Sequence, residues 1–203
     1  MADVSFDEFY GEIALQASGV PEPLMDRAIV RAMRSFCNVS EYWRMTLEPE
    51  PVFGGVGELF LPRDSEVVRP LWVRLGDREL IAKSDHSLLD VKPGRARAYA
   101  LGGTTLTLVP VVDGQLTERL VARVILQPTR NASRVPGAIG DRYYEAVVAG
   151  ALSYVCAQVD QPWGNADLAS IHGSSFSQYV EEARRRAGKE GAHVPRVVSY
   201  GGI

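Results

Sequence analysis

An uninterrupted apolar segment runs from Ala146 to Leu152, in the last third of the 203-residue chain. We expect it to lie in a helix that begins at Asp141, which can cap it, and that ends near Asp160, before Pro162. A helix that is apolar on almost every side has to be surrounded by protein. Because a chain of this length has little material with which to surround a helix completely, we expect this helix to lie partly against another subunit.

Two helices are predicted near the N-terminus. The first should start at Ser5, which has capping-box spacing to Glu8, and should stop at Gly19, because glycine enters a left-handed C-cap without strain. Pro21 suits the opening turn of the second helix, which should end between Val39 and Tyr42. Apolar residues recur at helical spacing in both segments, so each should bury one face.

A fourth helix should begin at Asn165, which can cap it, and should end at Gly188. Its last turn carries Arg184, Arg185 and Arg186, where cations complement the helix dipole. The residues expected on its core face are Leu168, Ile171, Ser175, Phe176, Tyr179 and Ala183.

Between these helical regions the hydrophobic period changes to that of strands. Thr105–Leu108 alternates polar and apolar residues, which predicts a strand with one buried face. Turn-forming pairs such as Gly76-Asp77 and Gly102-Gly103 separate the apolar runs. We therefore expect a small antiparallel sheet or sandwich. The predicted strands are Glu58–Leu61, Val67–Leu75, Glu79–Ile81, Ala98–Leu101, Thr104–Val111 and Leu120–Leu126.

The resulting prediction is an α+β protein in which two N-terminal and two C-terminal helices form a helical bundle, with the small antiparallel β-domain inserted and an extended C-terminal arm. The expected domains are residues 1–44, the β-domain 45–130, a helical hairpin 131–188 that packs with 1–44, and the arm 189–203. The arm has no periodicity, yet it is more apolar than a solvated tail needs to be. We expect it to dock on a partner.

Composition excludes several classes of protein. The 22 Lys and Arg residues against 25 Asp and Glu residues give a net charge of −3, unlike a strongly basic nucleic-acid binder. No apolar run approaches the roughly 20 residues that a membrane span needs, and the N-terminus lacks the pattern of a secretory signal. Cys37 and Cys156 are too few for a disulfide framework. We expect a protein that is made in the cytoplasm and has no membrane contact.

A search for reactive constellations finds none. His86, His172 and His193 lie far apart, without the spacing of a metal site. The glycine clusters at 54–57 and 102–103 lack the lysine of a phosphate-binding loop and are explained by hairpin turns. Adjacent carboxylates on a helix diverge, so they cannot act as a catalytic pair. We therefore expect no catalytic, cofactor-binding or metal-binding residues, and no enzyme activity.

Several segments carry a resemblance to a known family. Tyr143–Leu152 continues through the turn Gln161–Ala169, in which Pro162 ends one helix, Trp163 fills the hairpin and Asn165 caps the next helix. This region resembles the C-terminal helical hairpin of tailed-bacteriophage head-to-tail connector adaptor proteins, the tail tubular A-like or head completion adaptors. The further segments that are similar to the family are Phe176, Glu181–Ala187, Glu58–Pro62, Arg97–Tyr99 and Val109–Gly114.

The resemblance implies a structural virion protein at the head-tail interface, made in the cytoplasm of a bacterial host. It implies a ring, usually of twelve subunits, which docks on the portal protein, joins it to the tail tube or nozzle, and lines a channel for double-stranded DNA. The net negative charge agrees with such a channel, because every contact with a phosphate would slow the passage of DNA.

The same resemblance places the contact with the portal or a neighbouring subunit at the end of the last helix and in the arm. The residues expected to make it are Arg184, Arg185, Arg186, Arg196, Val197, Val198 and Tyr200. For the three consecutive arginines, a solvated last turn is the other interpretation. Two other functions stay open: a tail-completion or tail-terminator protein, and a small ligand-binding module.

Overall fold

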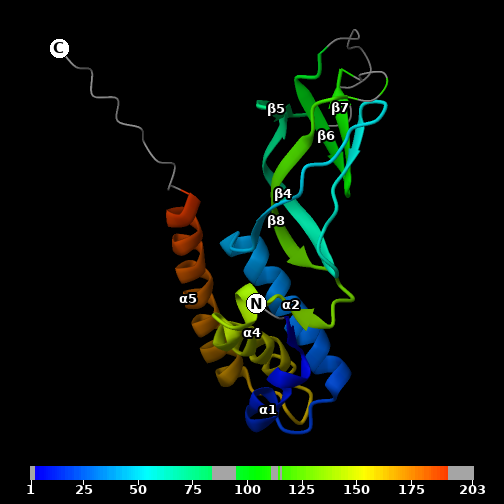
Figure 1. Cartoon of the computed structure of the whole chain (residues 1–203). Coiled ribbons are helices and arrows are strands. Elements are labelled where there is room, and N and C mark those ends of the chain that lie inside the picture. Colours follow the sequence, from blue (N-terminus) through cyan, green and yellow to red (C-terminus); the bar gives the residue numbers. More distant parts are fainter. Residues whose placement is uncertain (1–2, 84–94, 111–113, 115, 192–203) are drawn as a thin grey trace, which may run out of the picture.

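The computed structural model describes residues 3–83, 95–110, 114 and 116–191. The helices are α1 (Asp7–Gln16), α2 (Glu22–Ser40), α3 (Gly137–Gly140), α4 (Tyr144–Cys156) and α5 (Ala166–Gly191). The strands are β1 (Val4–Ser5), β2 (Arg44–Thr46), β3 (Val56–Glu58), β4 (Ser65–Leu75), β5 (Arg78–Ala82), β6 (Ala98–Gly102), β7 (Thr105–Val109), β8 (Leu120–Pro128) and β9 (Arg134–Val135). The sheet stands at one end of the helices, and β4 and β8 run between the two parts (Figure 1).

The fold is α+β, but its architecture differs from the expected helical bundle with a small antiparallel domain. The main sheet has seven strands in the order β2-β8-β4-β5-β6-β7-β3. One neighbouring pair is parallel, because β5 and β6 align Ile81 with Ala98 and Ala82 with Tyr99. A second sheet pairs β1 with β9 and thereby joins the segment before α1 to the segment before α3. The hydrophobic pattern does not predict these two strands.

The chain forms two hydrophobic cores. The helical core is built from α1, α2, α4 and α5, with Phe9, Phe36 and Ile13 among its fully buried side chains. The sheet core is built from the strands, with Leu106 and Leu108 at its centre. Trp43 is partly buried and packs against both cores. The segment between α2 and β2 therefore connects the two parts of the molecule.

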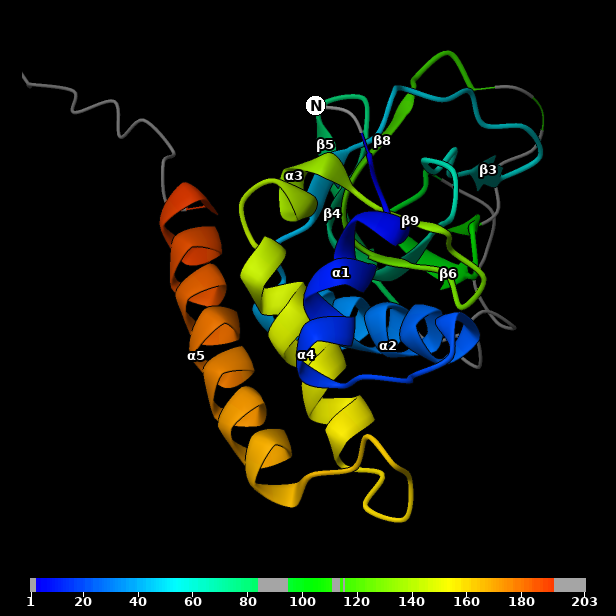
Figure 2. The same cartoon turned by 90° about the horizontal axis from the view of Figure 1, so that it is seen from below.

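Helix α4 lies between α5 on one side and α1 and α2 on the other (Figure 2). All residues from Ala146 to Leu152 are buried by the chain itself. The expectation that this segment needs another subunit to cover it is therefore wrong. A chain of this length covers α4 because three helices from distant parts of the sequence converge on it, and the apolar pattern of α4 alone does not reveal this.

Several predicted boundaries are also corrected. Helix α4 begins at Tyr144, three residues after the expected cap Asp141, because the short helix α3 occupies the preceding turn. It ends at Cys156, before the expected Asp160. Helix α5 continues through Gly188, its expected end, and ends at Gly191.

Three further differences concern two single positions and one strand. Ser5 lies in β1 and does not cap α1, although its N–H donates to Glu8 Oε1 at 3.1 Å, as in half of a capping box. Ile171 is 59% exposed and does not belong to the core face of α5. The strand expected at Glu58–Leu61 lies closer to the N-terminus than predicted, since β3 begins at Val56 and ends at Glu58.

Candidate functional site

The end of α2 is shaped by one buried serine and one strained glutamate. Ser40 is fully buried, and its hydroxyl donates to the Phe36 carbonyl at 2.6 Å and accepts from the Tyr42 N–H at 3.3 Å. Glu41 follows in the left-handed conformation (φ 52°, ψ 31°), and its N–H donates to the Cys37 carbonyl. A left-handed residue at this place ends a helix and redirects the chain. Glu41 thus turns the chain from α2 into β2.

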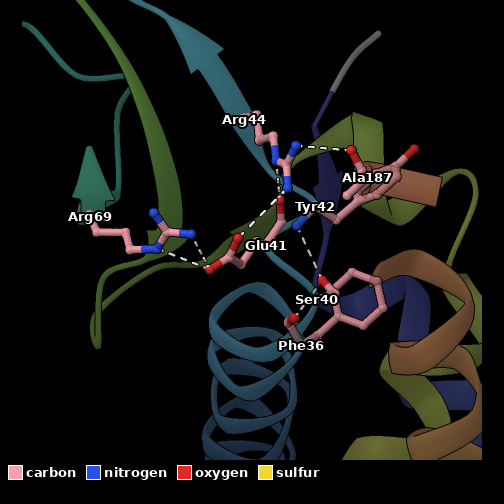
Figure 3. Close-up of polar contacts among 7 residues, drawn as sticks. All are labelled: Phe36, Ser40, Glu41, Tyr42, Arg44, Arg69 and Ala187. Atoms are coloured by element: carbon pink, nitrogen blue, oxygen red, sulfur yellow. Dashed lines mark hydrogen bonds and ion pairs between the residues drawn. The ribbon is translucent and has the colours of Figure 1, made fainter. Parts of the chain in front are cut away.

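The Glu41 carboxylate holds two arginines that come from different strands (Figure 3). Oε1 accepts from Arg69 on β4, at 2.9 Å from Nε and 2.6 Å from Nη2. Oε2 lies 3.7 Å from Arg44 Nη2, and the Glu41 carbonyl accepts from Arg44 Nε at 2.8 Å. Arg44 Nη1 donates to the carbonyl of Ala187 on α5 at 2.9 Å. The end of α2, two strands and the last turns of α5 therefore meet at one point.

A second polar link joins α2 to the sheet. Arg34 donates from Nη2 to Glu66 Oε1 at 2.8 Å and from Nη1 to the Pro128 carbonyl at 2.6 Å. Glu66 on β4 lies opposite Gln127 on β8, whose side-chain amide donates to the same carboxylate oxygen at 2.7 Å. Burial opposes ionisation of Glu66, but the hydrogen bonds from Arg34 and Gln127 outweigh it and lower the pKa of Glu66.

The lowered pKa of Glu66 predicts a loss of stability in acid. The Glu66 contribution is fully present above the unfolded value of about 4.5 and is lost as the pH falls through the lower folded pKa. Glu66→Gln should cost up to about 1 kcal/mol at neutral pH, since the side chain is partly exposed, and should flatten the acid limb of the stability profile. Urea unfolding at neutral pH and at successively lower pH measures this.

Arg34→Met provides the matching variant, because it removes the cation and should raise the pKa of Glu66. Both variants should therefore lose less stability than the wild type between neutral pH and acid. Parallel profiles for all three proteins would show that the Arg34–Glu66 pair does not contribute.

An aromatic cluster lies beside this junction. The ring centroid of Tyr143 lies 5.0 Å from that of Phe36 and 5.0 Å from that of Tyr42. The Tyr42 hydroxyl accepts from Arg142 Nη1 at 3.1 Å. Burial raises the pKa of Tyr143, whose hydroxyl is buried and has no hydrogen-bond partner in the part of the chain that the structure describes. The cluster therefore joins the residue that precedes α4 to the end of α2.

The three consecutive arginines lie near the C-terminal end of α5 and do not converge. The Arg184 side chain is 64% exposed and its Nη1 lies 3.7 Å from Glu181 Oε1. Arg186 Nη2 lies 3.8 Å from Glu182 Oε1, and Arg185 is exposed. Ion pairs of this kind on a helix surface contribute little to stability. These guanidinium groups are therefore accessible to a partner. The other expected contact residues, Arg196, Val197, Val198 and Tyr200, lie outside the described residues.

The connection between α4 and α5 contains the cap of α5 and a close approach of two backbone segments. Asn165 Oδ1 accepts from the N–H groups of Asp167 and Leu168, both at 3.1 Å, which caps α5. Trp163 is half-buried against the helical core, while Pro162 is exposed. A Cβ on Gly164 would collide with the backbone of Gln158 and Val159. The turn needs glycine at position 164 because two segments of its backbone approach each other closely there.

The groups that could react are few and separated. Cys37 and Cys156 are buried, free thiols, and burial raises the pKa of both, which disfavours the nucleophilic thiolate. His172 contacts Gln16 Oε1 at 2.8 Å, and burial lowers its pKa. The described residues contain no group of three or more His, Cys, Asp or Glu side chains that could hold a metal ion.

One hollow in the described part of the chain has a volume of about 340 Å³. Its lining is mixed, with Trp43 and three prolines beside Asp3, Arg63, Asp64, Ser133 and Arg134. No helix in the described ranges is both long enough and apolar enough to span a bilayer.

Sequence reasoning missed the junction residues Glu41, Arg44 and Arg69. Glu41 and Arg44 have i,i+3 spacing at the end of a predicted helix, which is a weak signal. The bond from Arg44 to Ala187 joins residues 143 positions apart, and nothing in the local sequence indicates it.

The described part of the chain is thus an α+β structural unit in which two cores meet at a charged junction and an arginine-rich helix end is exposed. The family model of the SU10 adaptor protein matches residues 5–198, and the chain belongs to that family. It is therefore a structural adaptor protein of a bacteriophage, a component of the virion that works with portal and tail components. A comparison with curated proteins gave no match.

Proposed function

We propose that the protein is a head-to-tail connector adaptor of the tail tubular A-like class, which forms a ring of twelve copies between the portal and the tail. The observation that carries the proposal is the match of residues 5–198 to the adaptor family. The resemblance of the Pro162–Asn165 turn and its two flanking helices to connector adaptors supports the finer assignment.

In the proposed arrangement, the end of α5 and the arm 189–203 contact the portal or a neighbouring subunit. Arg184 and Arg185 are exposed at that end, where their charges are available to carboxylates of a partner. Val197, Val198 and Tyr200 would add apolar contact area. The domain division 1–44, 45–130, 131–188 and 189–203 is part of the same proposal.

The proposed channel conducts double-stranded DNA without binding it. A net charge of −3 on each subunit supports this role, because a basic lining would form phosphate contacts that slow the genome. The sheet would then face the tail or the outer wall of the ring.

Sizing of the full chain tests the proposal. The chain alone, or mixed with the portal protein of the same phage, is expected to form a species many times the 22.2 kDa of one subunit when measured by light scattering. The matched control is the portal alone, whose mass should rise when the adaptor is added. A monomer that leaves the mass of the portal unchanged would refute the proposed assembly.

A further inference from the structure

The last turns of α5 are held from outside the helix by Arg44. Its Nη1 donates to the Ala187 carbonyl at 2.9 Å, and the Arg44 side chain is only 18% exposed. Val180, Ala183 and Ala187 are buried on the same face of α5. Beyond Ala187 the helix runs on for one turn to Gly191, with Gly188 and Lys189 exposed. The bond to Arg44 therefore fixes α5 just before its end.

The position of Arg44 is itself fixed on several sides. Its backbone belongs to β2, where it lies opposite Ile125 on β8. Its Nε and Nη2 face the carbonyl and carboxylate of Glu41, and Arg69 holds that carboxylate with two further bonds (Figure 3). A guanidinium presents its donors in a rigid planar fork, so the hydrogen bond and the ion pair to Glu41 determine where Nη1 points. A cation beside the carbonyls at a helix C-terminus is also favourable.

We propose that Arg44 is a positioning residue, which sets the direction in which the end of α5 presents the exposed Arg184 and Arg185 to a partner. The part of this inference that concerns a partner rests on the proposed function, in which those residues contact the portal. The structural part stands on the contacts among Arg44, Glu41 and Ala187. A helix end that is already held in place has fewer orientations to lose on docking, so holding it raises the affinity for the partner.

Amide hydrogen exchange on the full chain tests the structural part. In Arg44→Met, which removes the fork and keeps the chain length, amides in the last turn of α5 should exchange roughly tenfold faster. Arg44→Lys keeps the charge without the fork and should fall between Arg44→Met and the wild type. Arg74→Met is the matched control, because Arg74 lies over Trp72 and pairs with Glu79 on the sheet. Its exchange at the end of α5 should equal that of the wild type.

Binding to the portal protein of the same phage tests the functional part. Arg44→Met should weaken binding by roughly tenfold, whereas the control Arg74→Met should bind portal as tightly as the wild type does. Unchanged exchange in the last turn of both Arg44 variants would overturn the inference. An equal loss of portal binding in Arg44→Met and Arg74→Met would also overturn it. If even the wild type fails to bind portal, the proposed function fails, while the exchange data still decide whether Arg44 fixes α5.

Discussion

Replacing Gly150 with valine is expected to remove much of the stability of the helical core. Gly150 lies where α2, α4 and α5 come together. A Cβ at this position would stand 2.7 Å from the Ala32 Cβ and 2.8 Å from Phe176 Cε2. The Phe176 ring can turn, but the Ala32 Cβ is attached directly to the backbone of α2, so the helices have to move apart. Overpacking of this kind costs about 3 kcal/mol, and valine adds two further methyl groups.

The measurement is thermal and urea unfolding of Gly150→Val beside a matched glycine variant. Gly11 lies in α1, and a Cβ there would meet nothing within 4 Å. Gly11→Ala should therefore keep the wild-type stability or gain about 0.5–1 kcal/mol, because alanine favours the helix over glycine. A Gly150→Val protein that unfolds at the same urea concentration as the wild type would show that the three helices are not in close contact there.

Removing residues 192–203 is expected to abolish capture by the portal while leaving the fold intact. Among the described residues, the two cores extend no further than Ala183, and α5 ends at Gly191. The truncated chain should therefore keep its stability to within about 0.5 kcal/mol. If the removed residues carry the principal apolar contact with the portal, affinity should fall by about a hundredfold or more. Calorimetric unfolding and portal pull-down of the two chains measure the two effects.

A full-length variant shows whether weaker portal binding comes from the lost apolar contact or only from the shortened chain. Val197→Asp with Val198→Asp keeps all 203 residues and places two charges where the proposal expects apolar contact. It should bind portal as weakly as the truncated chain, because burying unpaired carboxylates is costly. Portal capture that survives both changes would move the contact away from the arm.

The sequence predicts best those features that depend on local chemistry. The sequence places Pro21 in the opening turn of the second helix, and α2 begins one residue later, at Glu22, with Pro21 as its N-cap. A proline also lies in the first turn, where its fixed backbone suits the helix and its missing N–H is not needed. The expected strand 98–101 corresponds to β6, and the expected strand 104–111 contains the shorter β7, since a Gly-Gly turn joins two alternating segments. In both cases the determining residues lie close together in the chain.

Features that depend on distant contacts were predicted wrongly or not at all. The parallel pairing of β5 with β6 joins segments on either side of residues 83–97, and hydrophobic alternation does not specify strand direction. The burial of α4 depends on α1 and α5, which approach it from opposite ends of the sequence. Glu41 adopts a conformation usually reserved for glycine, so the charged junction around it has only the weak local signal of the i,i+3 pair Glu41 and Arg44.

The most direct test of the account is the position of this chain in the intact phage particle, measured by electron cryomicroscopy. The account predicts a ring of density between the portal and the tail into which α5 and the seven-stranded sheet fit, with the end of α5 toward the portal. Density for the chain elsewhere in the particle, or a portal joined to the tail without it, would contradict the account.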